Sequence, residues 1–348
     1  MTRVAILAYD GCLATEVYGL SDLLQMANRV IDARGGRDRR FRVSVVSPAA
    51  GTIRPASGPP LTTSRARGVD QLVVPGFEAV PGQDLDRVLD GLEREAAFVR
   101  RVASRGVPVA SVCVGAFVLG QAGLLDDRAA TTGWLFSSPL AARHPRATVR
   151  SDEVLVHDGP VTTAGAFSAV FDLALHLIRQ HCGDAVARAT ARIALVADNR
   201  RSQAPHIDEA LRTLRAEPFS HAVQQHLRER LADPYDLTAL ARAHAVSTRT
   251  LLRRFGAETG ESPLAFLQRS RIDAAKRLLE APGARVAEVM ERVGYLDPAA
   301  FRKLFLRHTG MTPATYRRQF TSTAATGPPA PPDRRSRGPG RADGGPAT

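Results

Sequence analysis

A cysteine stands where a hydrolase would keep a nucleophile. The segment "VPVASVCVGAFVLGQAG" (107–123) places Cys113 between a β-branched apolar run and a helix of small residues. Gly115 and Ala116 permit a tight turn from strand to helix. A helix that begins there would lower the pKa of the thiol, because its N-terminus carries positive potential. The alternative interpretation is that Cys113 is a small buried hydrophobic residue.

A nucleophilic cysteine also needs a base within hydrogen-bonding reach, and that base is usually a histidine. Here Val114 follows the cysteine, and the stretch "ATTGW" puts Gly133 before Trp134. Nothing in the sequence places His144 or His157 at the thiol, so a surface or structural role is expected for both. We therefore expect a binding site and not an active centre, with no catalytic residue and no cofactor.

Basic side chains recur on two predicted helices in the last third of the chain. Ser247 is a good N-cap for a helix in which Leu251 and Phe255 face inward. The 3.6-residue period then places on the outer face Thr248, Arg249, Leu252 and Arg253. About 50 residues later, Phe301 and Phe305 take the inward positions. The matching outward residues are Ala299, Arg302 and Lys303.

A predicted helix and a short turn precede each of these two basic helices. This is the helix-turn-helix layout, whose second helix enters the major groove of DNA. Residues 262–282 are expected to form one helix between the two motifs, which could hold them about one DNA turn, ~34 Å, apart. The alternative is a generic helical bundle with a basic surface.

The segments that must position the cysteine alternate between strand-like and helix-like patterns. Strands are expected at 3–9, 41–48, 71–76 and 107–113. Residues 154–165 are expected to form a strand pair that turns at Asp158-Gly159. Helices are expected at 16–33, 84–106 and 166–183. This alternation predicts an α/β doubly wound, flavodoxin-like domain with a mostly parallel sheet covered on both faces.

Four segments follow from these patterns. Residues 1–197 form the α/β domain, and 198–215, polar and with a proline, form a linker. Residues 216–322 form an all-α domain with two helix-turn-helix motifs. Residues 323–348 are a Pro/Gly/Arg-rich tail, which should be disordered because it cannot bury enough apolar surface to offset its ordering entropy.

Composition favours a polyanionic partner. The 348 residues carry a formal net charge of +12, which points to nucleic acid, although an arginine-rich coding bias is an alternative explanation. The 3 cysteines show no CxxC spacing, so neither a disulfide framework nor a metal site is expected. No signal peptide or membrane span is expected, which favours a cytoplasmic, nucleoid-associated protein.

The C-terminal motifs resemble the AraC/XylS family of bacterial transcription regulators over residues 220–320. The most specific match is "GYLDPAAFRKLFLRHTGMTPATYRRQ", and "GESPLAFLQRSRIDAAKRLL" matches the family's linker helix. The resemblance implies that Arg249 and Arg253 contact bases or phosphates in one groove, and Arg302 and Lys303 in the next. Leu252 and Ala299 stand where many relatives carry polar residues, so apolar contact with thymine methyl groups is expected.

The N-terminal half resembles the ThiJ/PfpI superfamily, class I glutamine amidotransferase-like, over residues 3–185. The resemblance rests on Glu16, "VVPGF" (73–77) and "SVCVGAFVLGQAGLLDDRAATTGW" (111–134). It implies that Cys113 is the residue at the elbow and that the Glu16 carboxyl approaches its thiol. Gly76 and Val114 would supply backbone N–H groups of an oxyanion-hole type. Trp134 is the best candidate for a pocket wall, and further wall candidates are Phe77, Phe117, Phe136 and Phe167.

The order of the two halves resembles the GlxA branch of regulators, and "NRRSQAPHI" (199–207) resembles that branch's linker. Many members of the branch have histidine at the position of Gly133. We expect a non-enzymatic regulator that binds double-stranded DNA and whose first domain senses a small metabolite or dimerises. A small-molecule effector, a homodimer and RNA polymerase are the expected partners. The alternatives are an active cysteine hydrolase or amidase, or a redox sensor at Cys113, fused to a DNA-binding domain.

Overall fold

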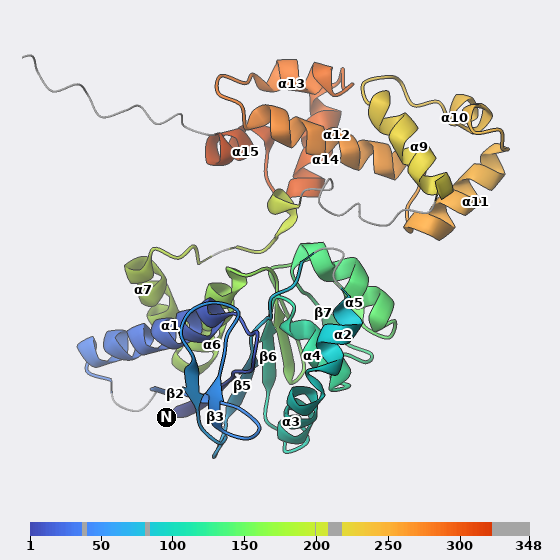
Figure 1. The fold of residues 1–348 in the computed structure, drawn as a ribbon. Coiled ribbons are helices and arrows are strands. Elements are labelled where there is room, and N and C mark those ends of the chain that lie inside the picture. The colour runs from blue at the N-terminus through green and yellow to red at the C-terminus, as the bar shows by residue number, and fades with distance from the viewer. Residues whose placement is uncertain (37–39, 81–83, 199, 208–217, 322–348) are drawn as a thin grey trace, which may run out of the picture.

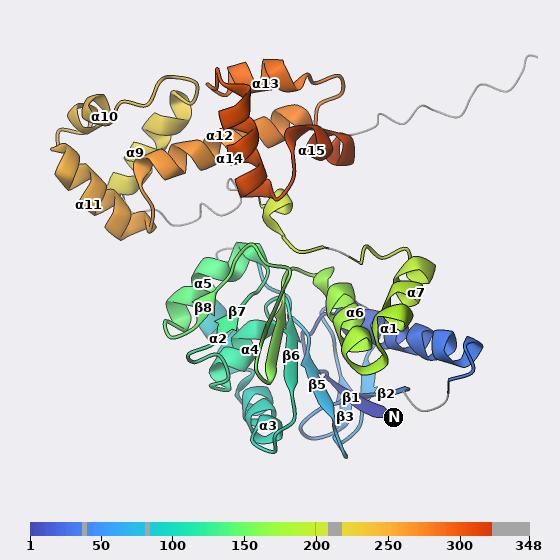
Figure 2. The same cartoon turned by 180° about the vertical axis from the view of Figure 1, so that it is seen from behind.

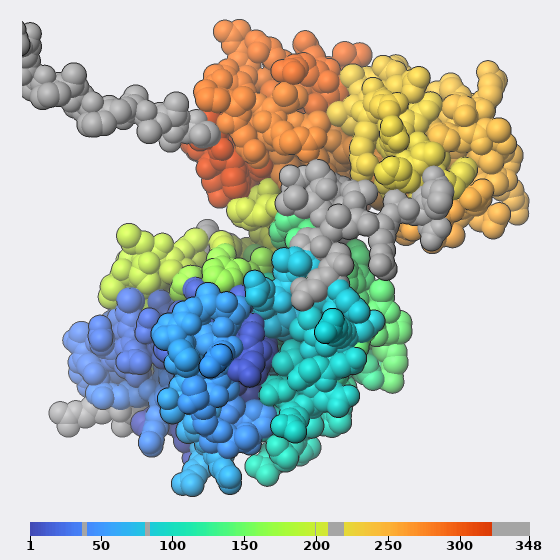
Figure 3. All heavy atoms as spheres, viewed as in Figure 1, coloured from blue at the N-terminus to red at the C-terminus, as the bar shows by residue number. Residues whose placement is uncertain are grey.

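The computed structural model describes residues 1–36, 40–80, 84–198, 200–207 and 218–321. It shows an α/β part and a helical part, joined by a segment that runs between them (Figure 1). The space-filling view shows the same two parts as separate masses, with the yellow-green segment where they meet (Figure 3). The tail predicted at 323–348 and the second half of the predicted linker lie outside the described residues.

The α/β part is built on a six-stranded sheet with the order β2-β1-β5-β6-β10-β9. The strands are β1 (Thr2–Leu7), β2 (Phe41–Val46), β5 (Gln71–Val74), β6 (Val109–Val112), β9 (Leu155–Asp158) and β10 (Val161–Ala164). All neighbours pair in parallel except β9 and β10, which form the predicted antiparallel pair. This order confirms the flavodoxin-like fold.

Helices cover both faces of this sheet, which explains why β5, β6 and β10 are buried along their whole length. One face carries α1 (Ala14–Ala33), α6 (Ala169–Cys182) and α7 (Asp184–Ala194). The other carries α2 (Leu85–Asp90), α3 (Glu93–Ala103), α4 (Gly115–Gln121) and α5 (Ser137–Arg143) (Figures 1 and 2). Short elements complete this part: β3 (Gly51–Ile53), β4 (Leu61–Thr63), β7 (Ala129–Ala130), β8 (Thr148–Val149) and a 3-10 turn, η1 (Trp134–Phe136).

The prediction of a single helix over 84–106 is wrong, because the chain forms two helices, α2 and α3, with a break between them. Asp84 caps the first helix by accepting hydrogen bonds from the backbone N–H groups of Asp86 and Arg87. The break at Gly91 redirects the chain, so that Leu89 and Leu92 are both buried in the same core. Burial of these two leucines outweighs the continuous helical pattern of the sequence.

Every element described between 218 and 320 is a helix. These are α9 (Pro218–Glu229), α10 (Leu237–Ala243), α11 (Thr248–Thr259), α12 (Pro263–Leu279), α13 (Val286–Arg292), α14 (Pro298–Thr309) and α15 (Pro313–Phe320). They pack around two separate cores, one under α10 and α11 and one under α13 and α14. The long helix α12 supplies residues to both cores, so it joins the two motifs rigidly as the sequence predicts.

The two motifs repeat their local chemistry at a spacing of 50 residues. Ser247 and Asp297 cap α11 and α14, and Gly260 and Gly310 end these helices in the left-handed conformation. The hydroxyl groups of Thr259 and Thr309 donate to the carbonyl oxygens of Phe255 and Phe305. Ser262 and Thr312 then cap the next helix of each motif. Equivalent caps give the two motifs equivalent helix boundaries.

Within the described ranges no helix combines the length and the apolar character that crossing a bilayer requires.

Candidate DNA-binding surface and elbow site

The outer face of α11 is the first part of the candidate DNA-binding surface. Leu251 and Phe255 are fully buried in the first helical core. The opposite face exposes Arg249 and Arg253, and Leu252 keeps 41% of its surface accessible. Thr248, in the first turn, is half-buried. An exposed apolar residue between two exposed arginines gives this face both charge and a contact for a base methyl group.

The outer face of α14 is the second part. Phe301 and Phe305 are buried in the second helical core, so α14 is oriented in its motif as α11 is in its own. The residues exposed on its other face are Ala299, Arg302 and Lys303. The first turn of α14 therefore presents a small apolar residue where α11 presents Arg249.

The charges on these two faces are not neutralised by neighbours. Among the described residues, Arg249, Arg253, Arg302 and Lys303 form no ion pair and no hydrogen bond through their side chains. Arg254 differs, because its guanidinium lies 3.6 Å from Glu258 and 4.0 Å from the centre of the Phe219 ring. Arg253 can therefore reach a phosphate or a base without first breaking an internal contact, whereas Arg254 cannot.

A buried arginine, which the sequence analysis did not single out, fixes one motif against the other. Arg271 on α12 is 9% exposed and donates to the carbonyl oxygens of Leu231 at 2.7 Å and Gly294 at 3.2 Å. It also donates to the Asp233 carbonyl at 2.5 Å and lies over the Tyr295 ring. Its position on the inward face of an amphipathic helix was the available signal, because an arginine there needs internal acceptors.

In the α/β part, Cys113 follows β6 in the left-handed conformation, with φ of +52°. Its backbone N–H donates to the carbonyl oxygens of Ala164 at 3.0 Å and Gly165 at 2.8 Å. Its own carbonyl accepts a hydrogen bond from the Thr132 hydroxyl at 2.8 Å. Three hydrogen bonds to the Cys113 backbone thus hold the elbow in a conformation that is unfavourable for a residue with a side chain.

Two glycines allow the predicted elbow to form. A Cβ atom on Gly115 would lie 2.6 Å from the Val74 carbonyl oxygen, so only glycine fits between β5 and α4. A Cβ on Gly76 would lie 3.2 Å from Cβ of Cys113 and 3.3 Å from Oε2 of Glu16. The predicted residues Glu16, Gly76 and Cys113 therefore converge on one point.

Glu16 is 1% exposed and its carboxyl occupies the centre of this site. Its Oε2 accepts a hydrogen bond of 2.6 Å from the Gly76 N–H, and Oε1 has no partner among the described residues. Burial raises the pKa of Glu16 to about 8, against the opposing effect of the Gly76 N–H. The Gly76 N–H is thus already engaged, and it does not point into an open oxyanion hole.

The expectation that the elbow lowers the thiol pKa is wrong. Burial and the nearby Glu16 raise the pKa of Cys113 to about 12, although the backbone N–H groups of Val114, Phe167 and Gly133 act in the opposite direction. The helix that follows, α4, has only 7 residues. Its dipole therefore does not offset the cost of placing a thiolate in this half-buried site next to a buried carboxyl group.

Gly133 lies directly against the thiol, where a Cβ would be 3.4 Å from Sγ. The next residue, Trp134, is half-buried at the start of η1. His144 packs against Gly120 on α4, and His157 shares a hydrogen bond of 2.8 Å with Thr162. Neither histidine is placed to serve Cys113 as a base.

The predicted pocket walls divide into two groups. Phe77, Phe117 and Phe136 are buried in the core of the α/β part and are structural residues. Phe167 is 46% exposed and, with half-buried Trp134, stays accessible to a ligand. Three cavities lie elsewhere in the structure. Two are lined by α12 and by residues between 202 and 207, and the third is lined by residues of α9 and α10. None of the three includes Cys113. The residues that the structure describes contain no group of three potential metal-binding side chains.

Comparison with known proteins gives the family of each part. The model of the DJ-1/PfpI family matches residues 2–180, and the model of a helix-turn-helix domain matches residues 240–319. The chain is 27% identical over 283 residues to the HTH-type transcriptional regulator GlxA of Rhizobium meliloti, covering 81% of this chain and 86% of that protein. It is 26% identical over 299 residues to the HTH-type transcriptional regulator CdhR of Pseudomonas aeruginosa, covering 84% and 86%.

Among solved structures, the chain is similar to a ThiJ/PfpI family protein from Pseudomonas syringae, at 19% identity and a TM-score of 0.48. That match covers 70% of this chain and 90% of the other. The resemblances inferred from the sequence are confirmed for both halves. The chain belongs to the DJ-1/PfpI family and carries an AraC-type helix-turn-helix domain behind the family's α/β domain.

Proposed function

We propose that this protein is a sequence-specific DNA-binding transcriptional regulator. The observation that carries the proposal is the repeated surface on α11 and α14. On both helices, cations that have no partner among the described residues are exposed opposite buried apolar anchors. α12 holds the two faces in one rigid unit, as reading two successive major grooves requires. The net charge of +12 supports a polyanionic partner, and the relatives named above are transcriptional regulators.

We propose a role for each of the four expected segments. Residues 1–197 sense a small metabolite or dimerise, residues 198–215 link the two domains, residues 216–322 bind DNA, and residues 323–348 form a tail. A small-molecule effector would act by binding more tightly to one arrangement of the two domains than to the other. A homodimer would lengthen the operator, and contact with RNA polymerase would connect DNA binding to transcription. Such a protein acts in the cytoplasm at the nucleoid.

The α/β domain is proposed to be non-catalytic. Cys113 is neutral at physiological pH because of its raised pKa, and a neutral thiol is a poor nucleophile. Glu16 has a pKa of about 8 and therefore holds its proton near pH 7, so it is not the base that a cysteine hydrolase needs. The same raised thiol pKa disfavours a redox sensor, since oxidation begins from the thiolate.

Replacing Arg253 with alanine tests the DNA-binding role. The variant should lose about tenfold or more in affinity for an operator selected from random duplex DNA, because one exposed arginine contact is removed from the groove. Gel-shift titration at fixed salt measures the loss, and circular dichroism checks that the fold is intact.

Arg94→Ala is the matched control, since Arg94 is exposed on α3 of the other domain and its removal changes the net charge equally. An Arg253→Ala affinity equal to that of the control would overturn the assignment of α11 as a DNA reader.

A further inference from the structure

A short segment, residues 202–207, is bound by both domains. We refer to it as the strap. It contains a 3-10 turn, η2 (Ala204–His206), and appears in yellow-green between the two parts of the molecule (Figure 1). Its polar sequence predicts only a linker, yet Gln203, Ala204 and Pro205 are buried. The buried positions show that the strap is packed on its surroundings.

Gln203 anchors the strap in the α/β domain. It is 4% exposed, and its Oε1 accepts a hydrogen bond of 3.1 Å from the Ala166 N–H. Its Nε2 lies within hydrogen-bonding distance of four oxygens: Thr132 O at 2.9 Å, Ser151 O and Glu153 O at 3.1 Å, and Thr131 Oγ1 at 3.3 Å. The Gln203 backbone N–H also donates to the Asp152 carbonyl at 2.7 Å. A single amide therefore satisfies polar groups from three separate loops.

Two of those loops are the ones that hold the elbow. Thr132 accepts from Gln203 through its carbonyl and donates to the Cys113 carbonyl through its hydroxyl. Gly165 accepts from the Cys113 N–H, and a Cβ on Gly165 would lie only 2.7 Å from the Gln203 amide carbon. Thr132 and Gly165 thus each contact both Gln203 and Cys113. A change at the elbow therefore moves groups that contact Gln203.

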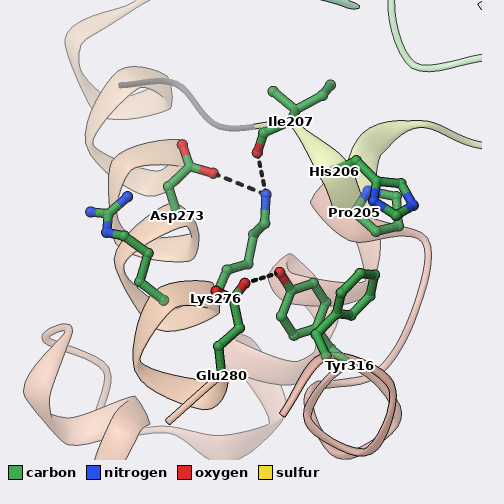
Figure 4. Close-up of a pocket in the computed structure, with 9 residues that line it drawn as sticks. Pro205, His206, Ile207, Asp273, Lys276, Glu280 and Tyr316 are labelled. Carbon is green, nitrogen blue, oxygen red and sulfur yellow. Dashed lines mark hydrogen bonds and ion pairs between the residues drawn. The ribbon is translucent and has the colours of Figure 1, made fainter. Parts of the chain in front are cut away.

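The other end of the strap is bound by α12 and α15, which pack in the core of the second helix-turn-helix motif (Figure 4). The Lys276 ammonium on α12 donates to the Ile207 carbonyl and lies 3.7 Å from the Asp273 carboxylate. The His206 ring lies edge-on to the Phe320 ring of α15, with centroids 5.3 Å apart. Lys276 is 6% exposed, so these contacts are shielded from solvent.

The surroundings of the strap leave room for movement. A cavity of about 410 Å³ lies between the two domains, lined from the α/β side by Ser151 and Asp152 and from α14 by Arg307 and His308. A second cavity of about 250 Å³ lies between the strap, α12 and α15. Because close packing does not fill the space beside the strap, the strap can shift without repacking either domain.

From these contacts we propose that Gln203 is a positioning residue: it couples the state of the elbow to the position of the second DNA-reading motif. The inference deepens the proposed function and rests on it. A ligand or side chain that displaces the loop at Thr132 or Ala166 removes hydrogen bonds from Gln203. The strap then transmits the displacement to α12 and α15 through Ile207 and His206.

The test perturbs the elbow genetically and follows hydrogen–deuterium exchange by mass spectrometry in the full chain without DNA. Gly133→Val places a side chain against the thiol and beside Ala166, and Gly133→Ala is the milder form. In the otherwise unchanged chain, we expect exchange in the strap, α12 and α15 to rise by about fivefold or more. In the Gln203→Met background, the same change should add less than about twofold at α12 and α15.

Gln121→Met is the matched control, because Gln121 is a half-buried residue of the same type whose amide donates to the Leu89 carbonyl, away from the strap. Its background should keep the full response. Lys276→Met removes the ammonium group that holds the Ile207 carbonyl and leaves the α/β domain unchanged. It should therefore abolish the response of α12 even if Gln203→Met does not fold.

The proposal is overturned if α12 and α15 respond equally with and without Gln203, or if they fail to respond while peptides at the elbow do. Gel-shift titration of the same proteins separates this inference from the proposed function. A chain that transmits the exchange response but binds no duplex DNA would refute the regulator and leave the coupling standing.

Discussion

At the elbow, two ionisable side chains face each other in an environment that favours their neutral forms. The Glu16 carboxyl has one backbone N–H donor and no partner for Oε1 among the described residues. A thiolate at Cys113 would stand beside it without a compensating cation. The cost of burying charge therefore decides the chemistry of the site, and the elbow geometry alone does not produce a nucleophile.

Glu16→Gln should change how stability depends on pH. Between about pH 5 and pH 8, the unfolded chain has released the Glu16 proton while the folded chain retains it, so stability falls as pH rises. Glutamine keeps an acceptor for the Gly76 N–H and cannot ionise. The stability of the variant relative to the natural chain should therefore increase by about 1–4 kcal/mol from pH 5 to pH 8.

Urea unfolding can be monitored by the fluorescence of Trp134, the single tryptophan of the chain. This signal reports on the domain that contains Glu16. Glu93→Gln, at an exposed carboxylate of α3, is the control. Parallel pH profiles for the natural chain and Glu16→Gln would contradict the buried, protonated carboxyl.

Cys113 should be slow to alkylate. With the thiol pKa near 12, the thiolate fraction at pH 8 is small, so iodoacetamide should react at least about a hundredfold more slowly than with glutathione. Peptide mapping by mass spectrometry over time gives the rate. A rate close to that of glutathione would instead favour the hydrolase or the redox sensor.

At the scale of elements, the two reader helices are built alike and differ in what they present. Identical spacing of caps and buried apolar anchors gives α11 and α14 the same orientation in their motifs. Their outer faces differ in the first turn, where Arg249 corresponds to Ala299. Arginine reads guanine through two hydrogen bonds, whereas alanine offers only apolar contact, so the two half-sites should differ in base preference.

Arg271→Met should lower both the stability of the helical domain and its affinity for DNA. The substitution leaves the carbonyl oxygens of Leu231, Asp233 and Gly294 without their shared donor, at a cost of about 2–4 kcal/mol in the free energy of unfolding. Because those carbonyls belong to both motifs, operator affinity should fall as well. Urea unfolding and gel-shift titration measure the two effects, with exposed Arg292→Met on α13 as control. Equal stability of the two variants would show that Arg271 does not fix the motifs.

Local signals made the helix-turn-helix motifs predictable. Ser247, Asp297 and the buried phenylalanines act within their own helices, so a sequence pattern is enough to find them. The state of Cys113 depends instead on Glu16, nearly 100 residues away, and could not be derived from the elbow segment. The strap escaped prediction for the same reason. Gln203 is polar by sequence, and its burial follows only from carbonyl groups that the fold gathers around it.

At the scale of the whole molecule, the proposed regulator is a DNA-reading unit connected to an α/β domain through one strap. The reading unit is rigid, because α12 supplies both cores and Arg271 bridges both motifs. Among the described residues, the segment that contacts both domains is the strap, and cavities border it. A small change in the α/β domain can therefore move the reading unit as a body, without repacking it.

The most direct test of the central claim is a hydroxyl-radical footprint of the full chain on an operator selected from random duplex DNA. Two protected blocks about one helical turn apart are expected, because α11 and α14 enter successive major grooves. Arg253→Ala should erase one block and Lys303→Ala the other, while Arg94→Ala should leave both. A single block, or loss of the same block in both variants, would contradict a chain that reads DNA with two helices.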